Sequence, residues 1–494
     1  MSAIEGSEAA RMMEEARNVR VWAALCLAIP LACLAPVGAL AHGAEGGIVL
    51  LLPTGYYLAG AAFVVAITFL LFSLLPDGFT RWLYARIIRF AAVAAPPGAW
   101  ISLASFLAMT VMVLAGFFGS RDPLLNPLPA VIWTLWWVCL TIAHGLFGHL
   151  WRVLNPWSGP LHLLRRLVKR PVGAQALLPL PAVLGYLPAL VQFYAFAWFE
   201  LVDLSPSDPA RLAIAVSLYW CLNLLAMLVF GEATWRMRGE PFSLFFFLIA
   251  KLSPIGFYRT PERRLCLFLC WPGKQLFDLL PLSVSGMAFI LLTLSTVTFD
   301  GFSRTFVWLS AIGVNPLEFP GRSAVMLSSS LGILLAFAAL ASLFALSVVL
   351  GCWLSGTRPM LPVAGRLIHS IIPISVAFQL SHYLTLVLVE MQNLGVAVSD
   401  PFARGWDLLG LADHHVTTSF LFTFEGVQAI FNTQTAAIAL GHVVAVILAH
   451  ALMAESAAGT PGHKRRLFWL ELPFAGLMVF YTAFGLWLLS TPRI

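Results

Sequence analysis

Long apolar runs separated by shorter polar segments dominate the pattern of this chain. A helix needs about 20 mostly apolar residues to cross the hydrocarbon core of a bilayer. After a first apolar run over 21–41, the pattern predicts ten such helices: 53–75, 99–119, 128–150, 181–202, 210–231, 281–297, 325–353, 366–392, 428–453 and 469–490. The apolar stretch 241–250 is too short to span, so we expect it to lie at the membrane interface or to re-enter the membrane.

The composition agrees with this pattern. Of the 494 residues, 60% are hydrophobic and 11% are charged, and the mean hydropathy is +0.88. A soluble domain contains about 25% charged residues. We therefore predict an all-α fold, a polytopic integral membrane bundle of about ten transmembrane helices that forms a single domain over 42–494.

Basic residues alternate along the chain in a way that predicts topology, because Lys and Arg concentrate in cytoplasmic loops. The basic loops are 76–98, 151–180, 232–280, 354–366 and 454–468. We expect these loops inside and the mature N-terminus outside. The positive residues of these loops account for the net charge of +6. The sequence carries no nucleic-acid-binding motif and no glycine-rich nucleotide fingerprint, so we expect no nucleic acid partner. Membrane lipids are expected to contact the basic stretch 162–170.

The N-terminal apolar run has two interpretations. Arg17 and Arg20 precede it and Ala39-Leu40-Ala41 ends it, which is the arrangement of a signal peptide over 1–41. Cleavage would leave His42 as the first residue of the mature chain. The alternative is an uncleaved first helix.

Two late predicted helices carry polar stripes, and ionisable groups inside a membrane indicate functional sites by default. The helix over 366–392 presents Ser375, Gln379, His382 and Glu390 at helical spacing, and the helix over 428–453 presents Gln428, Asn432, Thr435, His442 and His450. Neither stripe can face lipid, so we expect the two helices to face each other. The alternative to a site is interhelical hydrogen bonding that holds the helices together, and the site itself could be a proton or ion relay.

Histidines and carboxylates converge on the outer side of this topology, which predicts a metal site. Imidazole is a ligand for Zn, Cu, Fe and Ni. The expected ligands of a divalent metal ion, with Zn or Cu suspected, are His42, His382 and His442. A free N-terminal histidine could chelate the metal through its amine and its ring, although His42 could equally be a plain lead-in residue.

Several stretches together resemble a bacterial family of polytopic membrane proteins identified as fenitrothion hydrolase. The stretches are AHG (41–43), WRVLNPW (151–157), GEATWRMRGEPFSLFFFLIAKLSPIG (231–256), FDGFS (299–303), HYLTLVLVEMQ (382–392), SDPFARGWDLLG (399–410), GHVVAVILAH (441–450) and ELPFAGLMVFYTAFGL (471–486). The likeness runs in order along nearly the whole chain. Residue by residue it highlights His42, Asp300, His382, Gln392, Asp407 and His442, and it departs where relatives have EGQ and this chain has Glu390-Met391-Gln392.

The resemblance implies a multi-pass protein of the bacterial inner membrane that hydrolyses organophosphorus (phosphorothioate) triesters, with a second, related membrane subunit as a partner. A small apolar substrate would enter from the bilayer. A metal would lower the pKa of bound water, Glu390 or Asp407 would orient that water or bind a second metal, and Asp300 would support an imidazole from behind.

Two other functions remain open. The AHG start resembles copper-handling proteins, which suggests a metal-ion or proton-coupled transporter. An assembly subunit that stabilises a catalytic partner is the third possibility.

Overall fold

Helices make up about three quarters of the structure, a computed structural model that describes residues 49, 51–76, 78–94, 96–168, 176–260, 264–315, 321–411, 413–457 and 462–491. Within these ranges, nine helical segments are long and apolar enough to cross a membrane. They are α3 (Thr54–Leu74), α5 (Gly98–Phe118), the run of α6 (Pro127–Ala130), η1 (Val131–Cys139) and α7 (Leu140–Phe147), α11 (Pro209–Phe230), α14 (Val284–Ser303), α16 (Gly321–Ser355), the run of α17 (Met360–Leu367), η4 (Ile368–Ile371) and α18 (Ile372–Ser399), α19 (Phe424–Ala457) and α20 (His463–Ser490). The predicted all-α polytopic bundle is confirmed. The expected signal peptide and His42 lie outside the described residues.

The tenth expected span, 181–202, is shorter than predicted. Its helix, α10 (Leu187–Leu201), has 15 residues. The apolar residues before it cannot extend the helix, because Pro179 and Pro181 lack a backbone donor and Gly185 has a positive φ of 49°. Hydropathy alone therefore overestimates the length of this helix.

Short helices fill the space between the spans. They are α4 (Gly78–Ala85), α8 (Trp151–Leu154), α9 (Ser158–Leu167), α12 (Glu232–Arg238), α13 (Pro241–Ala250) and α15 (Phe306–Ala311), with 3₁₀ turns at η2 (Ala182–Leu184), η3 (Lys274–Leu276) and η5 (Ser419–Phe422). The helix α13 begins where the Glu240 side chain accepts hydrogen bonds from the amides of Phe242 and Ser243, at 2.9 and 2.6 Å. Nine of its ten residues are buried, so this segment packs inside the protein and not on its surface.

A three-stranded antiparallel sheet is the one element type that the hydropathy pattern did not indicate. Its strands are β1 (Ile87–Val93), β2 (Ile255–Arg259) and β3 (Leu265–Cys270), in the order β1-β3-β2. Gly256 pairs with Phe268 in the register of β2 and β3, and any side chain at Gly256 would overlap the Phe268 ring. The glycine therefore lets the two strands approach.

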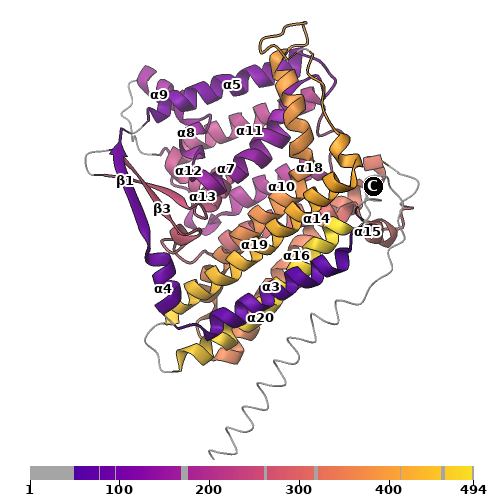
Figure 1. The fold of residues 1–494 in the computed structure, drawn as a ribbon. Coiled ribbons are helices and arrows are strands. Elements are labelled where there is room, and N and C mark those ends of the chain that lie inside the picture. The colour runs from indigo at the N-terminus through magenta and orange to yellow at the C-terminus, as the bar shows by residue number, and fades with distance from the viewer. Residues whose placement is uncertain are drawn as a thin grey trace, which may run out of the picture.

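The C-terminal helices enclose α14, which is the most deeply buried span. In its apolar window 83% of the residues are buried, against 22% in α3. Figure 1 shows α3, in indigo, lying along α20 and α19 from the opposite end of the chain, with α14, α16 and α18 nearby. Polar side chains on α14 consequently face protein.

The two late helices pack against each other, but histidines of their polar stripes contact other helices: His382 contacts Asp300 on α14, and His450 contacts Glu471 on α20. Gly441 on α19 lies against Ala377 on α18, where a larger residue would overlap the Ala377 side chain. Next to this contact, Ser381 and Gln434 exchange hydrogen bonds with each other's backbone carbonyl groups at 3.0 and 2.9 Å. Close backbone approach at a small residue with polar bonds beside it is a common way for membrane helices to associate.

Loops that were expected on the same side of the membrane lie together. Arg81, Lys274 and His463 come from three of the basic loops and line one cavity. Elsewhere, Arg322 donates a hydrogen bond at 3.0 Å to the carbonyl oxygen of Glu200, which joins two segments expected outside. This grouping supports the alternation of spans, and which side faces the cytoplasm stays a prediction.

Candidate functional site

A histidine and an aspartate meet in the interior of the bundle. Nε2 of His382, on α18, lies 2.7 Å from Oδ2 of Asp300, on α14. The two side chains are 11% and 4% exposed. Because an ionised carboxylate only accepts hydrogen bonds, this contact places the ring proton on Nε2 and leaves Nδ1 as the basic nitrogen.

Three further polar residues surround the carboxylate of Asp300. Arg304, one helical turn later, lies 3.0 Å from Oδ1. The hydroxyl of Tyr383 lies 3.2 Å from Oδ2 of Asp300 and 3.0 Å from Oε1 of Glu200, on α10. A phenol has one proton, so it can donate to only one of these two carboxyl groups at a time. His382, Asp300, Tyr383 and Glu200 thus form a continuous line of polar contacts, in which the Tyr383 proton bonds one carboxyl group at a time.

Sequence reasoning missed Glu200 and Tyr383 as members of this group. Glu200 was a visible candidate, since it is a carboxylate at the end of an apolar run, and such residues indicate sites. The signal for Tyr383 was weaker. It follows His382 directly, and neighbours in a helix point about 100° apart, so spacing alone did not place it on the same stripe.

A small cavity adjoins His382. Its volume is about 10 Å³, which is near the minimum for one water molecule. Residues of α14, α18, α19 and α20 line it, among them Gly301, Phe378 and Ile438. A side chain at Gly301 would lie 3.6 Å from Nδ1 of His382, in ordinary contact with it. The glycine therefore keeps the basic edge of the ring uncovered.

His442 is fully buried on α19. Its Nδ1 lies 2.9 Å from the carbonyl oxygen of Ile438, and its Nε2 is buried without a hydrogen-bond partner among the described residues. Its ring lies against Phe378 and Tyr481, with centroid separations of 6.2 and 6.3 Å. Phe378 thus contacts His442 and also lines the cavity beside His382.

The expected metal ligands are not gathered by the part of the chain that the structure describes. No group of three His, Cys, Asp or Glu side chains there is arranged to hold a metal ion. His382 and His442 are in place on adjoining helices, whereas His42 lies outside the described residues. A site made by His42, His382 and His442 therefore stays a prediction.

Glu390 and Asp407 lie away from the pair. Glu390 is eight residues beyond His382 on α18, about 12 Å along the helix axis, and its Oε1 lies 3.4 Å from Nδ2 of Asn393. Asp407 accepts hydrogen bonds from the Ser399 hydroxyl at 3.0 Å and from the Leu411 amide at 2.7 Å. These bonds organise the loop after α18. The catalytic roles expected for Glu390 and Asp407 stay predictions.

Gln392 holds the same loop. Its amide group donates to the carbonyl oxygen of Thr417 at 3.2 Å and accepts from the Thr417 amide at 3.0 Å. This two-way bond ties the chain before α19 to α18. A residue highlighted by resemblance thus has a clear structural task.

A second buried histidine–carboxylate pair lies elsewhere in the bundle. Nδ1 of His450, on α19, lies 2.9 Å from Oε2 of Glu471, on α20. Their side chains are 13% and 3% exposed, close to the values for His382 and Asp300. The structure therefore contains a second pair of similar burial, with which the roles of His382 and Asp300 can be compared.

No protein-family model, curated protein or solved structure matches this chain.

Proposed function

We propose that this chain is a membrane-embedded hydrolase of apolar organophosphorus triesters, in which the Asp300–His382 pair takes a proton from water. The observation that supports this best is the 2.7 Å contact between the two side chains, beside a small cavity whose volume is near the minimum for one water. The resemblance to fenitrothion hydrolases supplies the substrate class. Since fenitrothion is synthetic, the natural substrate is another apolar ester with a good leaving group.

The chemistry follows from the placement of the two ring nitrogens. Asp300 accepts a hydrogen bond from the Nε2–H group of His382 and so fixes the ring orientation. Nδ1 takes a proton from water as the water oxygen forms a bond to phosphorus. The bond from phosphorus to the aryl oxygen breaks, and the nitrophenolate leaves with the electron pair. A stabilised leaving group needs no general acid, and a positioned base of this kind contributes about 10²–10⁴ to the rate.

The triester is far larger than the cavity, so the helices around His382 must separate to admit its phosphorus. Lid and helix movements of this kind occur in many enzymes. Phe378 and Gly485 meet at the cavity, and any side chain at Gly485 would overlap the Phe378 ring. We infer that the α18–α20 contact is where the bundle opens.

The proposed role of the Asp300–His382 pair does not depend on the metal ion that the sequence predicts. His382 offers Nδ1 and Asp300 bonds the opposite nitrogen, which is the usual arrangement behind a metal-bound histidine. The described residues do not complete a ligand set. The proposed steps above therefore use only the pair, and a metal held with His42 stays a prediction about the cofactor.

The test is nitrophenolate release from fenitrothion by the purified full chain in detergent. Release above background supports the hydrolase. Loss of release with a chelator and its return with Zn²⁺ would add the predicted metal, and release that persists with chelator would assign water activation to the pair. No release from the chain alone or with a co-expressed related subunit would contradict the proposal.

A proton-coupled transporter is the second candidate, favoured by the continuous line of polar contacts from Glu200 through Tyr383 and Asp300 to His382. Buried ionisable chains carry protons in pumps and transporters. A transporter works only across a sealed membrane, whereas a hydrolase works in detergent. Proton flux into sealed vesicles, followed with a pH-sensitive dye, distinguishes the two functions.

A further inference from the structure

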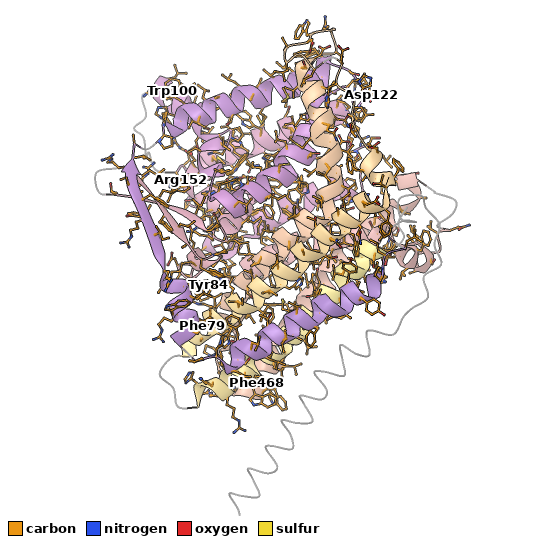
Figure 2. The ribbon with its side chains drawn as sticks, viewed as in Figure 1. Phe79, Tyr84, Trp100, Asp122, Arg152 and Phe468 are labelled. Carbon is orange, nitrogen blue, oxygen red and sulfur yellow. The ribbon has the colours of Figure 1, made fainter. Side chains whose placement is uncertain are left out.

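A large cavity lies at the end of the bundle where several basic loops meet, far along α19 from His442. Its volume is about 390 Å³, within the range of small-molecule sites, which is about 300–1,000 Å³. Its wall comes from α4, η3, the last turns of α19 and the first residue of α20. Figure 2 labels Tyr84 on α4, which is part of this wall.

Cationic side chains from separate segments line the cavity. Arg81 projects from α4 and Lys274 from η3, and His463 begins α20. The Lys274 ammonium lies 5.1 Å from the centre of the Phe277 ring, which also lines the cavity. The wall thus combines positive charge with aromatic surface.

A buried hydroxyl in the same wall has no acceptor for its proton. Tyr84 is 3% exposed, and the side chain beside its hydroxyl, Trp271, can only donate a hydrogen bond, so the hydroxyl proton has no acceptor among the described residues. Burial raises the pKa of the Tyr84 phenol above its usual range, so the phenol keeps its proton. A buried donor without an acceptor costs free energy, and an anion that enters the cavity and displaces the atoms covering the hydroxyl would supply that acceptor.

The one carboxylate in the wall is already paired. Glu455, near the end of α19, forms an ion pair with Arg366. Its charge is therefore balanced from outside the cavity wall. Arg81 and Lys274 remain as cations that face the cavity beside a neutral donor.

We propose that this cavity binds a phosphate-bearing anionic headgroup, with Arg81 and Lys274 on its charge and the Tyr84 hydroxyl on one of its oxygens. The position favours a phospholipid as the source, because the cavity lies beyond the last residues of the α3 span and at the start of α20, where lipid headgroups gather. A soluble phosphate ester would satisfy the same groups. This proposal is independent of the hydrolase.

The experiment is native mass spectrometry of the purified full chain with phosphatidylglycerol, with phosphatidylcholine as the neutral comparison. The wild type should retain one phosphatidylglycerol, and Arg81→Gln/Lys274→Gln should weaken retention by roughly tenfold or more. The matched control is Arg86→Gln/Arg89→Gln, which removes two charges from residues that follow Arg81 but do not line the cavity. Tyr84→Phe removes only the hydroxyl and should weaken retention to a smaller extent.

Inorganic phosphate distinguishes the two sources. If millimolar phosphate raises the melting temperature of the wild type but not of Arg81→Gln/Lys274→Gln, and displaces the lipid, the site takes soluble phosphate compounds. If phosphate has no effect while the lipid effect persists, the source is the membrane. Equal lipid and phosphate binding by the wild type, the double variant and Tyr84→Phe would overturn the proposal.

Discussion

Replacing Asp300 by Asn removes the charge of one buried carboxylate while keeping the shape of the side chain. Asp300 is 3% exposed and contacts His382, Tyr383 and Arg304. Hydrogen bonds to charged groups contribute about 1.5–3 kcal/mol and neutral ones about 1 kcal/mol, so weakening two of them costs about 1–4 kcal/mol. The Arg304 side chain is 52% exposed, so its ion pair adds at most about 1 kcal/mol.

This loss leaves a folded protein, because domain stabilities are about 5–15 kcal/mol. The rate of triester hydrolysis should fall much further. An uncharged amide neither fixes the proton on Nε2 of His382 nor stabilises the ring after Nδ1 gains a proton, so we expect kcat to drop by about 10²-fold or more. The assay is nitrophenolate release at saturating substrate, normalised to folded protein.

Glu471→Gln is the matched control. It makes the same change of carboxylate to amide in the His450 pair, at equal burial. We expect a similar fall in melting temperature with kcat near the wild-type value. Equal rate losses per folded molecule in Asp300→Asn and Glu471→Gln would show that the rate does not depend specifically on the Asp300 carboxylate, and an unchanged rate in Asp300→Asn would refute the assigned role outright.

Three further substitutions test the packing around the site. Tyr383→Phe removes a hydroxyl that Asp300 shares with a second carboxyl group, and should lower stability by about 1–3 kcal/mol in detergent melting experiments. Gly441→Leu overlaps Ala377 and should separate α18 from α19, lowering both the melting temperature and kcat; an unchanged melting temperature would contradict this contact. Gly256→Ala overlaps the facing ring on β3 and should lower the melting temperature alone, because the sheet is remote from the site.

Much of the fold could be predicted from hydropathy, because the bilayer requires long apolar helices that satisfy their own backbone hydrogen bonds. The small sheet could not. Its strand β1 follows a span directly and pairs with β3 far along the chain, and pairing across such a separation leaves no local pattern. The shortened α10 depended on its prolines, which hydropathy ignores.

The site was predicted in part. His382 and Asp300 were singled out separately, and the structure shows that they bond to each other. Glu390 and Asp407 shared a side of the membrane with them in the topology, but position along the membrane normal does not determine which helix faces which. The partners of His382 depend on the rotation of α14 and α10, and a sequence without its packing does not fix that rotation.

The most direct measurement is nitrophenolate release by purified His382→Ala and His450→Ala, compared with the wild type in the same detergent. Each variant removes one imidazole from a buried carboxylate, at similar exposure. We expect His382→Ala to fall to background, while His450→Ala keeps most of the wild-type rate per folded molecule. Wild-type release by well-folded His382→Ala would contradict the central claim that this histidine activates water.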